Sequence, residues 1–373
     1  MFRTKELEES YYNELKSQTT QLANMWIKKD FSLDVLQDDM VYNPLILHIN
    51  ECIKDEIKRG KLILPELNKD GNNATIIFSD YSNDKNLKNN KYYTYSFLVC
   101  GWNHSFPIKE HMEKIRKDNN VGTREIEFKG TDKLTKKIWS EYFNILDDFA
   151  CGLLFTVVID KDVGRFFEGG MSLDDLKENN SITGLTDFLK KHNYGEWKPR
   201  VAEELLRIVS IASYLAYLLT DDGQGLIWMT DNDAIASNED QHKNLMKLFD
   251  GLLRTYGNKK FHLGRALPFK ERDIYTMDLL SSTDIAASVL RDYLTKYKLN
   301  DNKNPVMMKE GSDSALDWLF RDGIALKKKT IIIENDEKGN IQAGVLNIYN
   351  EEKDILSNKE NTIPVYVNEY TYK

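Results

Sequence analysis

Long hydrophobic runs are absent from this chain of 373 residues. A membrane-spanning helix needs roughly eighteen or more consecutive apolar residues, so none is expected. The N-terminus also lacks the apolar core of a signal peptide. Cysteine is scarce: Cys52, Cys100 and Cys151 are odd in number and widely spaced, which argues against a disulfide scaffold or a zinc cluster. We therefore expect a cytoplasmic protein that has no membrane partner.

Basic charge is in deficit as well. The chain carries 51 Lys and Arg against 59 Asp and Glu, a net charge of -8. Such a balance excludes a polybasic binder, because the field of the whole molecule repels phosphate. It leaves room for a local basic groove, since residues 109–137 hold nine Lys or Arg and six acids. A solvated helical surface is the ordinary interpretation of that stretch.

Several catalytic motifs are missing too. The sequence contains no G-x-x-x-x-G-K-[ST], G-x-G-x-x-G, H-E-x-x-H or G-x-S-x-G. Phosphate-loop, dinucleotide-binding, zincin and serine-hydrolase functions therefore have no support. No two of the six histidines have ligand spacing; they are His48, His104, His111, His192, His242 and His262.

What is present is an alternation of helical and extended patterns, which indicates an α/β protein. We expect helices over 4–29, 43–59, 107–117, 134–149, 201–219, 241–254 and 283–297, and strands over 74–78, 92–102, 153–159, 226–229 and 260–263. The tail is expected to form a small antiparallel meander, with strands over 330–334, 341–349 and 362–368.

Carboxylates stand out by their positions along this pattern. They are Asp80 at the end of the first strand, Asp231 and Asp233 at the end of the strand over 226–229, Glu125 and Glu127 ahead of a helix, and Asp284 at a helix start. Ligands of α/β sheets bind at the carboxyl ends of strands. Each carboxylate also has an ordinary interpretation, because Asp is common in turns and at helix starts. Their order along the chain is more informative than any one of them.

That order resembles the ribonuclease H-like superfamily, and within it a bacterial family of unknown function. The matching segments are Asp80-Tyr81-Ser82, Glu127-Phe128-Lys129-Gly130, Thr230-Asp231-Asn232-Asp233 and Leu280-Ser281-Ser282-Thr283-Asp284-Ile285-Ala286. The likeness covers roughly residues 74–298. This chain departs from it at Asn83, where a glycine often follows the first motif.

The resemblance implies a ribonuclease H-like mixed central sheet flanked by helices, over residues 71–300. A helical N-terminal extension over 1–70 and a small β-rich C-terminal extension over 301–373 would lie outside it. The small residues Ala287 and Ser288 would let the last helix of the domain pack closely on the sheet.

The resemblance also implies a metal site for Mg²⁺ or Mn²⁺, with two ions. Asp80 would bridge both ions, Glu127 and Asp231 would each hold one side, and Asp284 would complete the second ion. Asp233 and Glu125 are reserve ligands. Carboxylates suit such hard cations, and two ions about 4 Å apart stabilise both the attacking and the leaving oxygen of a phosphodiester.

Basic side chains near the second motif are the expected contacts for a nucleic-acid substrate. Lys129 would contact the scissile phosphate as a point charge, while Arg124, Lys133, Lys136 and Lys137 would line the groove.

The leading hypothesis is thus a metal-dependent nuclease or phosphodiesterase. The alternative is a non-catalytic ribonuclease H-like scaffold that binds a protein partner or a second copy of itself, because fold alone does not guarantee chemistry. A third, weaker option is a carboxylate site for another phosphoryl substrate, such as a nucleotide. The acidic net charge favours the scaffold, and the full set of carboxylates favours the nuclease.

Overall fold

The structure is a computed structural model. It describes residues 5–25, 27–28, 36, 42–69, 71–82, 90–102, 106–128, 133–163, 166, 185–230, 235–265, 274–303, 306, 308, 311–350 and 366–372.

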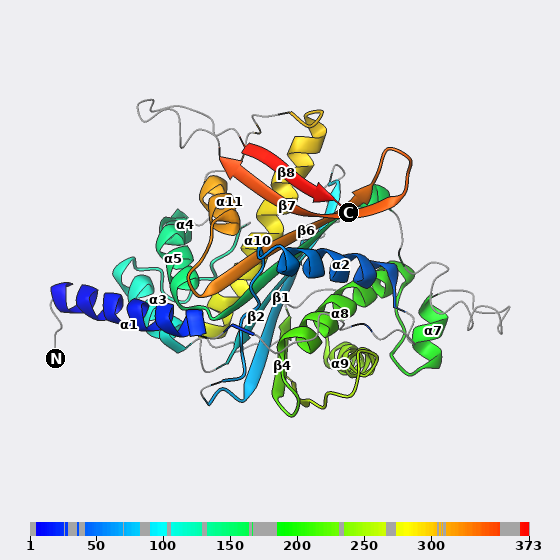
Figure 1. Cartoon of the computed structure of the whole chain (residues 1–373), viewed down its shortest axis with the longest axis horizontal. Coiled ribbons are helices and arrows are strands. Elements are labelled where there is room, and N and C mark those ends of the chain that lie inside the picture. The colour runs from blue at the N-terminus through cyan, green and yellow to red at the C-terminus, as the bar shows by residue number, and fades with distance from the viewer. Residues whose placement is uncertain are drawn as a thin grey trace.

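One mixed sheet runs through the molecule (Figure 1), and within the described residues it has eight strands in the order β5-β4-β1-β2-β3-β6-β7-β8. The strands are β1 (Ala74–Ser82), β2 (Tyr92–Gly101), β3 (Gly152–Asp160), β4 (Gly225–Thr230), β5 (His262–Arg265), β6 (Leu326–Asn335), β7 (Ile341–Asn350) and β8 (Tyr366–Tyr372). Strand β2 is antiparallel to both of its neighbours, β1 and β3. On the other side of β1, strands β4 and β5 are added in parallel.

Helices cover both faces of this sheet. They are α1 (Lys5–Met25), α2 (Pro44–Lys58), α3 (Phe106–Asp118), α4 (Lys133–Lys137), α5 (Trp139–Phe149), α7 (Leu185–Lys191), α8 (Pro199–Leu219), α9 (Glu239–Leu253), α10 (Ile274–Leu299) and α11 (Ser312–Phe320), with a short 3₁₀ turn η2 (Lys161–Val163) after β3. One face carries α2, α8 and α9, and the other carries α3, α5, α10 and α11. Because both faces are covered, β3 is buried along its whole length, as its β-branched and apolar sequence requires.

Alternation along β1 divides its side chains between the two layers. Ile76 and Phe78 belong to the core under α10, whereas Ile77 and Tyr81 pack on the side of α8. Asp80 has the parity of Ile76 and Phe78, so it faces the α10 layer. It lies two residues before the end of β1, rather than at the end as expected, because Tyr81 and Ser82 continue the pairing with β2.

The prediction that Asp284 lies at the start of a helix is wrong. Helix α10 begins at Ile274, so Asp284 lies near the middle of its 26 residues. The hydroxyls of Ser281, Ser282 and Thr283, which precede it, donate back to carbonyls of the preceding turn, at 2.8, 2.7 and 2.6 Å. Such back-bonding lets Ser and Thr sit inside a helix.

Strands β6, β7 and β8 form the expected antiparallel meander. Its first strand, β6, pairs in parallel with β3 and so attaches the meander to the rest of the sheet. Its last strand, β8, spans Tyr366–Tyr372, while expected residues 362–365 lie outside the described residues. Helices α7 and α11 were not predicted. Within the described part of the chain, no helix could span a membrane.

Candidate carboxylate site

Helix α10 lies directly on β1 and β2 (Figure 1). The approach is close because Ala287 and Ser288 are small and buried, at 0% and 1% exposed. Thr94 of β2 uses this proximity, since its hydroxyl donates to the carbonyl of Ala287 at 2.9 Å. The close packing expected from these small residues is therefore confirmed, and it fixes the distance between the sheet and the polar side chains of the helix.

A chain of hydroxyls connects Asp284 to the end of β1. Ser288 donates to Asp284 Oδ1 at 3.2 Å, and its own Oγ lies 3.3 Å from Ser82 Oγ. The buried guanidinium of Arg291 donates to the same Ser82 oxygen. Asp284, Ser288 and Arg291 recur at helical spacing, so one stripe of α10 presents them to β1.

Asp80 lies in the same layer, on the α10 side of β1 and two residues before Ser82. Its side chain is half-buried, and its Oδ1 accepts the backbone N–H of Tyr81 at 2.6 Å. Asp284 is also half-buried. Asp80 and Asp284 therefore both lie in the β1–α10 layer, and Asp80 is two residues before the Ser82 that Ser288 contacts.

The segment with the two glutamates meets α10 at the same place. The backbone N–H of Phe128 donates to Asp284 Oδ2 at 2.9 Å. Ile126 and Phe128 are buried at 0% and 2% exposed, whereas Glu125 and Glu127 are exposed. This alternation anchors the segment through its apolar side chains and turns both carboxylates toward solvent.

Arg116 of α3 holds this segment on α10. Its guanidinium bonds both carboxylate oxygens of Asp278, one of them at 3.1 Å, and donates to the carbonyls of Gly122 and Arg124 at 2.9 and 2.8 Å. Tyr142 adds a hydrogen bond to the Asp278 carbonyl at 2.5 Å. Burial, reinforced by the Asp278 charge, holds the pKa of the Tyr142 hydroxyl well above its ordinary value, so Tyr142 remains a donor.

Three of the expected residues cannot be placed: Lys129, Asp231 and Asp233 lie outside the described residues. The last described residue before the two aspartates is Thr230, which pairs with Ser79 of β1. Asp231 follows Thr230 in the sequence, just as Asp80 follows Ser79.

The expected substrate contacts have mixed surroundings. Arg124 is exposed, and its guanidinium donates to the carbonyls of Asn120 and Val121 at 3.3 and 3.1 Å. Lys133 and Lys137 are exposed on α4 and Lys136 is half-buried there. These lysines follow the glutamate segment in the chain and leave their charges near the surface.

Within the described residues, no group of three or more His, Cys, Asp or Glu side chains is arranged to hold a metal ion. Asp80, Glu127 and Asp284 alone therefore do not form such a group. The four-carboxylate set stays a prediction, because its fourth member lies outside the described part of the chain.

Sequence reasoning missed two cations of the site, Arg116 and Arg291. Arg291 had a detectable signal, since it follows Asp284 by seven residues and Ser288 by three, which is one face of a helix. Arg116 had none, because its partner Asp278 is 162 positions away.

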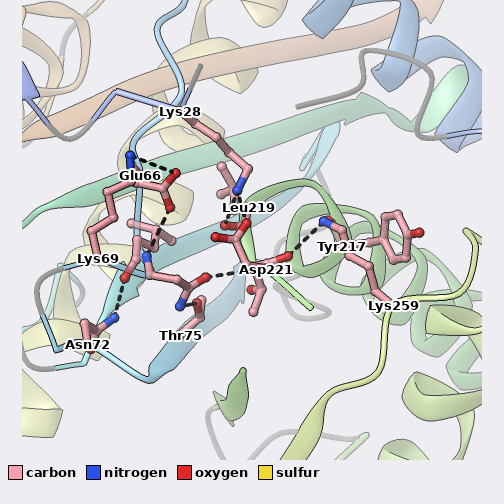
Figure 2. A network of polar contacts seen from close by, with 12 residues as sticks. Lys28, Glu66, Lys69, Asn72, Thr75, Tyr217, Leu219, Asp221 and Lys259 are labelled. Carbon is pink, nitrogen blue, oxygen red and sulfur yellow. Dashed lines mark hydrogen bonds and ion pairs between the residues drawn. The ribbon is translucent and has the colours of Figure 1, made fainter. Parts of the chain in front are cut away.

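A second polar network lies at the opposite end of β1 (Figure 2). Lys28 is 3% exposed, and its ammonium donates to Asp221 at 2.6 Å. Asn68 links this pair to the start of β1, since it accepts the Asp221 N–H at 2.9 Å and donates to Thr75 at 3.3 Å. The network thus closes the sheet edge where β1 begins, away from Asp80.

Lys259 completes the network of Figure 2 at the end of α8. Its ammonium donates to the carbonyls of Tyr217 and Thr220 at 2.7 and 2.9 Å, where a helix leaves acceptors without partners. Burial, with a contribution from the Lys28 charge, lowers the pKa of Lys259 to about 8. Capping of α8 explains this lysine without any role in binding.

Comparison with known proteins finds no match to this chain, either among models of protein families or among curated proteins.

Proposed function

We propose that this protein is a metal-dependent nuclease or phosphodiesterase whose Mg²⁺ or Mn²⁺ ions are held by Asp80, Glu127, Asp231 and Asp284. One observation carries the proposal: Asp284 accepts the backbone N–H of Phe128 and is linked through Ser288 to Ser82. A single carboxylate thus ties together three of the segments that carry the predicted ligands.

The sheet supports the ribonuclease H-like part of the proposal. An antiparallel β1–β2–β3 meander is extended beyond β1 by parallel β4 and β5. This is a mixed central sheet flanked by helices, of the kind that the resemblance implies. The C-terminal strands β6, β7 and β8 follow β3 in the sheet order, so β2 and β3 separate them from β1. They are therefore not neighbours of the strand that carries Asp80.

The donor set suits hard divalent cations. Asp80 and Asp284 are half-buried and Glu127 is exposed, so their oxygens face a region that solvent and substrate reach. Bound ions would stabilise charge on the attacking and leaving oxygens of a phosphodiester. The hydrogen bonds from Phe128 N–H and Ser288 hold the Asp284 carboxylate in one orientation, which a ligand to a metal needs.

The cations around the site have separate tasks in this proposal. Arg291 is buried at 3% exposed and bonds Ser82, so it orients the end of β1. Lys133 and Lys137 are exposed and suit contact with the phosphates of a nucleic acid. Lys129 is assigned to the scissile phosphate from its motif alone.

A non-catalytic scaffold is the second candidate. It is favoured by the net charge of -8. In that case Asp284 would serve only to attach the 121–128 segment to α10.

The deciding experiment is a cleavage panel over single- and double-stranded DNA and RNA, with Mg²⁺, Mn²⁺ or chelator. The nuclease proposal expects cleavage of at least one substrate with metal and none with chelator. It also expects the Asp80→Asn protein to be inactive, whereas Asp336→Asn, a change in a remote β-turn, leaves activity unaltered. A full-length, folded protein that cleaves no member of the panel under any metal condition would favour the scaffold.

A further inference from the structure

Helix α1 lies on the surface of the molecule, beside α3 and α5 (Figure 1). Not one of its residues from Leu7 to Met25 is buried, although the helix is 21 residues long. By contrast, α2 is shorter and buries seven residues. A helix is stabilised in a protein chiefly by the apolar face that it buries. We therefore expect α1 to separate from the rest of the protein at a lower free energy than global unfolding requires.

Asp148 of α5 is the centre of the polar contacts that hold α1. The Tyr12 hydroxyl donates to Asp148 Oδ2 at 2.8 Å, and the Lys16 ammonium lies 2.8 Å from the same oxygen. Glu8 adds an ion pair with Lys114 of α3 at 3.2 Å, but both groups are partly exposed and such pairs contribute little. A groove of about 890 Å³ lies between α1 and α3, so the two helices do not pack along their whole lengths.

The ring of Tyr12 lies against His111 of α3. The two rings meet edge to face at 4.8 Å, and the imidazole also stacks on Phe149 at the same distance. His111 is 7% exposed, and its buried Nε2 has no hydrogen-bond partner in the described part of the chain. Both nitrogens of an imidazolium are donors, so the docked arrangement leaves a proton on Nε2 without an acceptor. Docking of α1 therefore favours the neutral ring.

The charges around His111 act in both directions. Burial lowers the pKa of His111, Glu110 and Asp148 raise it, and Lys114 lowers it again, so that it lies below its ordinary 6.5. On α1, the charge of Lys16 is paired with Asp148. When α1 separates, the imidazole is exposed and Asp148 loses its partners on α1, so both changes raise the pKa of His111. The separated state then binds more protons than the docked state, and acid favours separation.

We propose that α1 is a pH-sensitive strap, docked on α3 and α5 at neutral pH and released in mild acid when His111 takes up a proton. Helix α3 stays in place on release, since its own apolar residues Ile108 and Met112 are buried at 0% and 1% exposed. A terminal helix that merely frays would also be weakly held, but its release would not depend on His111. The inference is independent of metal binding and of cleavage.

The test is hydrogen exchange of the full-length protein at pH 7.5 and 5.5, with rates converted to protection factors so that the pH dependence of the exchange chemistry cancels. Exposed carboxylates stay largely ionised in this range, whereas an exposed histidine takes up a proton. Protection of α1 is expected to fall at least about threefold at pH 5.5, while β2 and β3 stay protected. Equal protection of α1 at both pH values would overturn the proposal. So would protection of α1 as high as that of β2 and β3, because α1 would then open only with the whole protein.

Two variants and a control assign the effect to its residues. His111→Phe keeps the ring stack but cannot be charged, so its α1 protection is expected to be the same at both pH values. Tyr12→Phe keeps the ring but loses the bond to Asp148, and about a fivefold loss of α1 protection is expected at pH 7.5. The matched control is His192→Phe, at an exposed histidine after α7, which should keep the wild-type response.

A pH response that persists in His111→Phe, or that disappears in His192→Phe, would overturn the proposal. Should His111→Phe fail to fold, Tyr12→Phe decides in its place. Unchanged α1 protection in that variant would show that the contact with Asp148 does not hold the helix, and the strap would be excluded.

Discussion

Arg116 and Asp278 form a buried ion pair, at 5% and 1% exposed, in which the guanidinium bonds both oxygens of the carboxylate. The same guanidinium also satisfies the carbonyls of Gly122 and Arg124. One side chain of α3 therefore joins α10 to the segment that carries Glu125 and Glu127. The pair positions the glutamates of the proposed site without facing a substrate.

Replacement of Arg116 by Gln is expected to lower the free energy of unfolding by about 3–5 kcal/mol, because it leaves the Asp278 charge buried and unpaired. Arg124→Gln is the matched control, since that guanidinium is exposed, and a change within about 0.5 kcal/mol is expected. Urea unfolding of both variants measures the difference. A loss below about 1 kcal/mol for Arg116→Gln would mean that the pair adds little to the fold.

The general architecture could be predicted because it follows from local pattern. The apolar runs 76–78 and 153–159 are strands, and the apolar helix over 201–219 is buried, since each must be covered on most of its surface. The start of α10 could not be predicted from the same kind of pattern. Ser281 and Ser282 are frequent at helix caps, and only the position of the preceding carbonyls decides whether they bond forward or back.

The proposed site was predictable only in part, for the same reason. The shared face of Asp80 and Ser82 follows from strand parity, and the outward direction of Glu127 follows from its apolar neighbours Ile126 and Phe128. What could not be predicted is contact between distant segments. The Phe128 N–H bonds Asp284 at a separation of 156 residues, and no local pattern specifies such a partner.

Two substitutions of Asp284 should separate catalysis from folding. In Asp284→Asn, the side-chain oxygen still accepts the Phe128 N–H and the amide donates to Ser288, so stability is expected to stay within about 1 kcal/mol of wild type while cleavage is lost. Asp284→Ala removes both bonds and should cost about 1–3 kcal/mol as well as activity. Thermal melts and the cleavage panel are the measurements. An active Asp284→Asn protein would remove Asp284 from the ligand set.

Asp80→Asn tests the electrostatics of the same site. Like charges crowded together without metal repel one another, so the loss of one charge should leave the protein in chelator as stable as wild type or more stable. Cleavage in Mn²⁺ should disappear. If Asp80 were structural, Asp80→Asn would lower the free energy of unfolding in chelator by roughly 1–3 kcal/mol and leave cleavage intact. That result would contradict the proposed mechanism.

Metal itself should stabilise the wild-type protein. An ion that binds only the folded state raises the melting temperature by mass action, so millimolar Mg²⁺ or Mn²⁺ is expected to raise it, and chelator to reverse the rise. The Asp80→Asn/Asp284→Asn double variant is the control and should show a smaller shift. Equal shifts in both proteins would place the responsible ion elsewhere.

Lys259 gives the last prediction, which concerns pH. Its pKa is lowered in the folded protein to about 8 from an ordinary 10.5, chiefly by burial. Below pH 8 both the folded and the unfolded chain hold the proton, and the full cost of the buried ammonium is present. Between about pH 8 and 10.5 the unfolded chain binds more protons than the folded one, so this group makes the free energy of unfolding rise with pH.

Other groups titrate in the same range, so the measurement has to be a difference. The free energy of unfolding of wild type minus that of Lys259→Met is expected to increase by about 1 kcal/mol from about pH 7.5 to 9.5, less than a fully buried ammonium would give because Lys259 is only half-buried. Lys260→Met, a change at the exposed neighbouring residue, is the matched control and should give a nearly constant difference. Urea unfolding at several pH values measures both. A Lys259 difference that stays flat or falls with pH would show that the ammonium keeps its ordinary affinity for protons, and that its bonds to the Tyr217 and Thr220 carbonyls fully offset its burial.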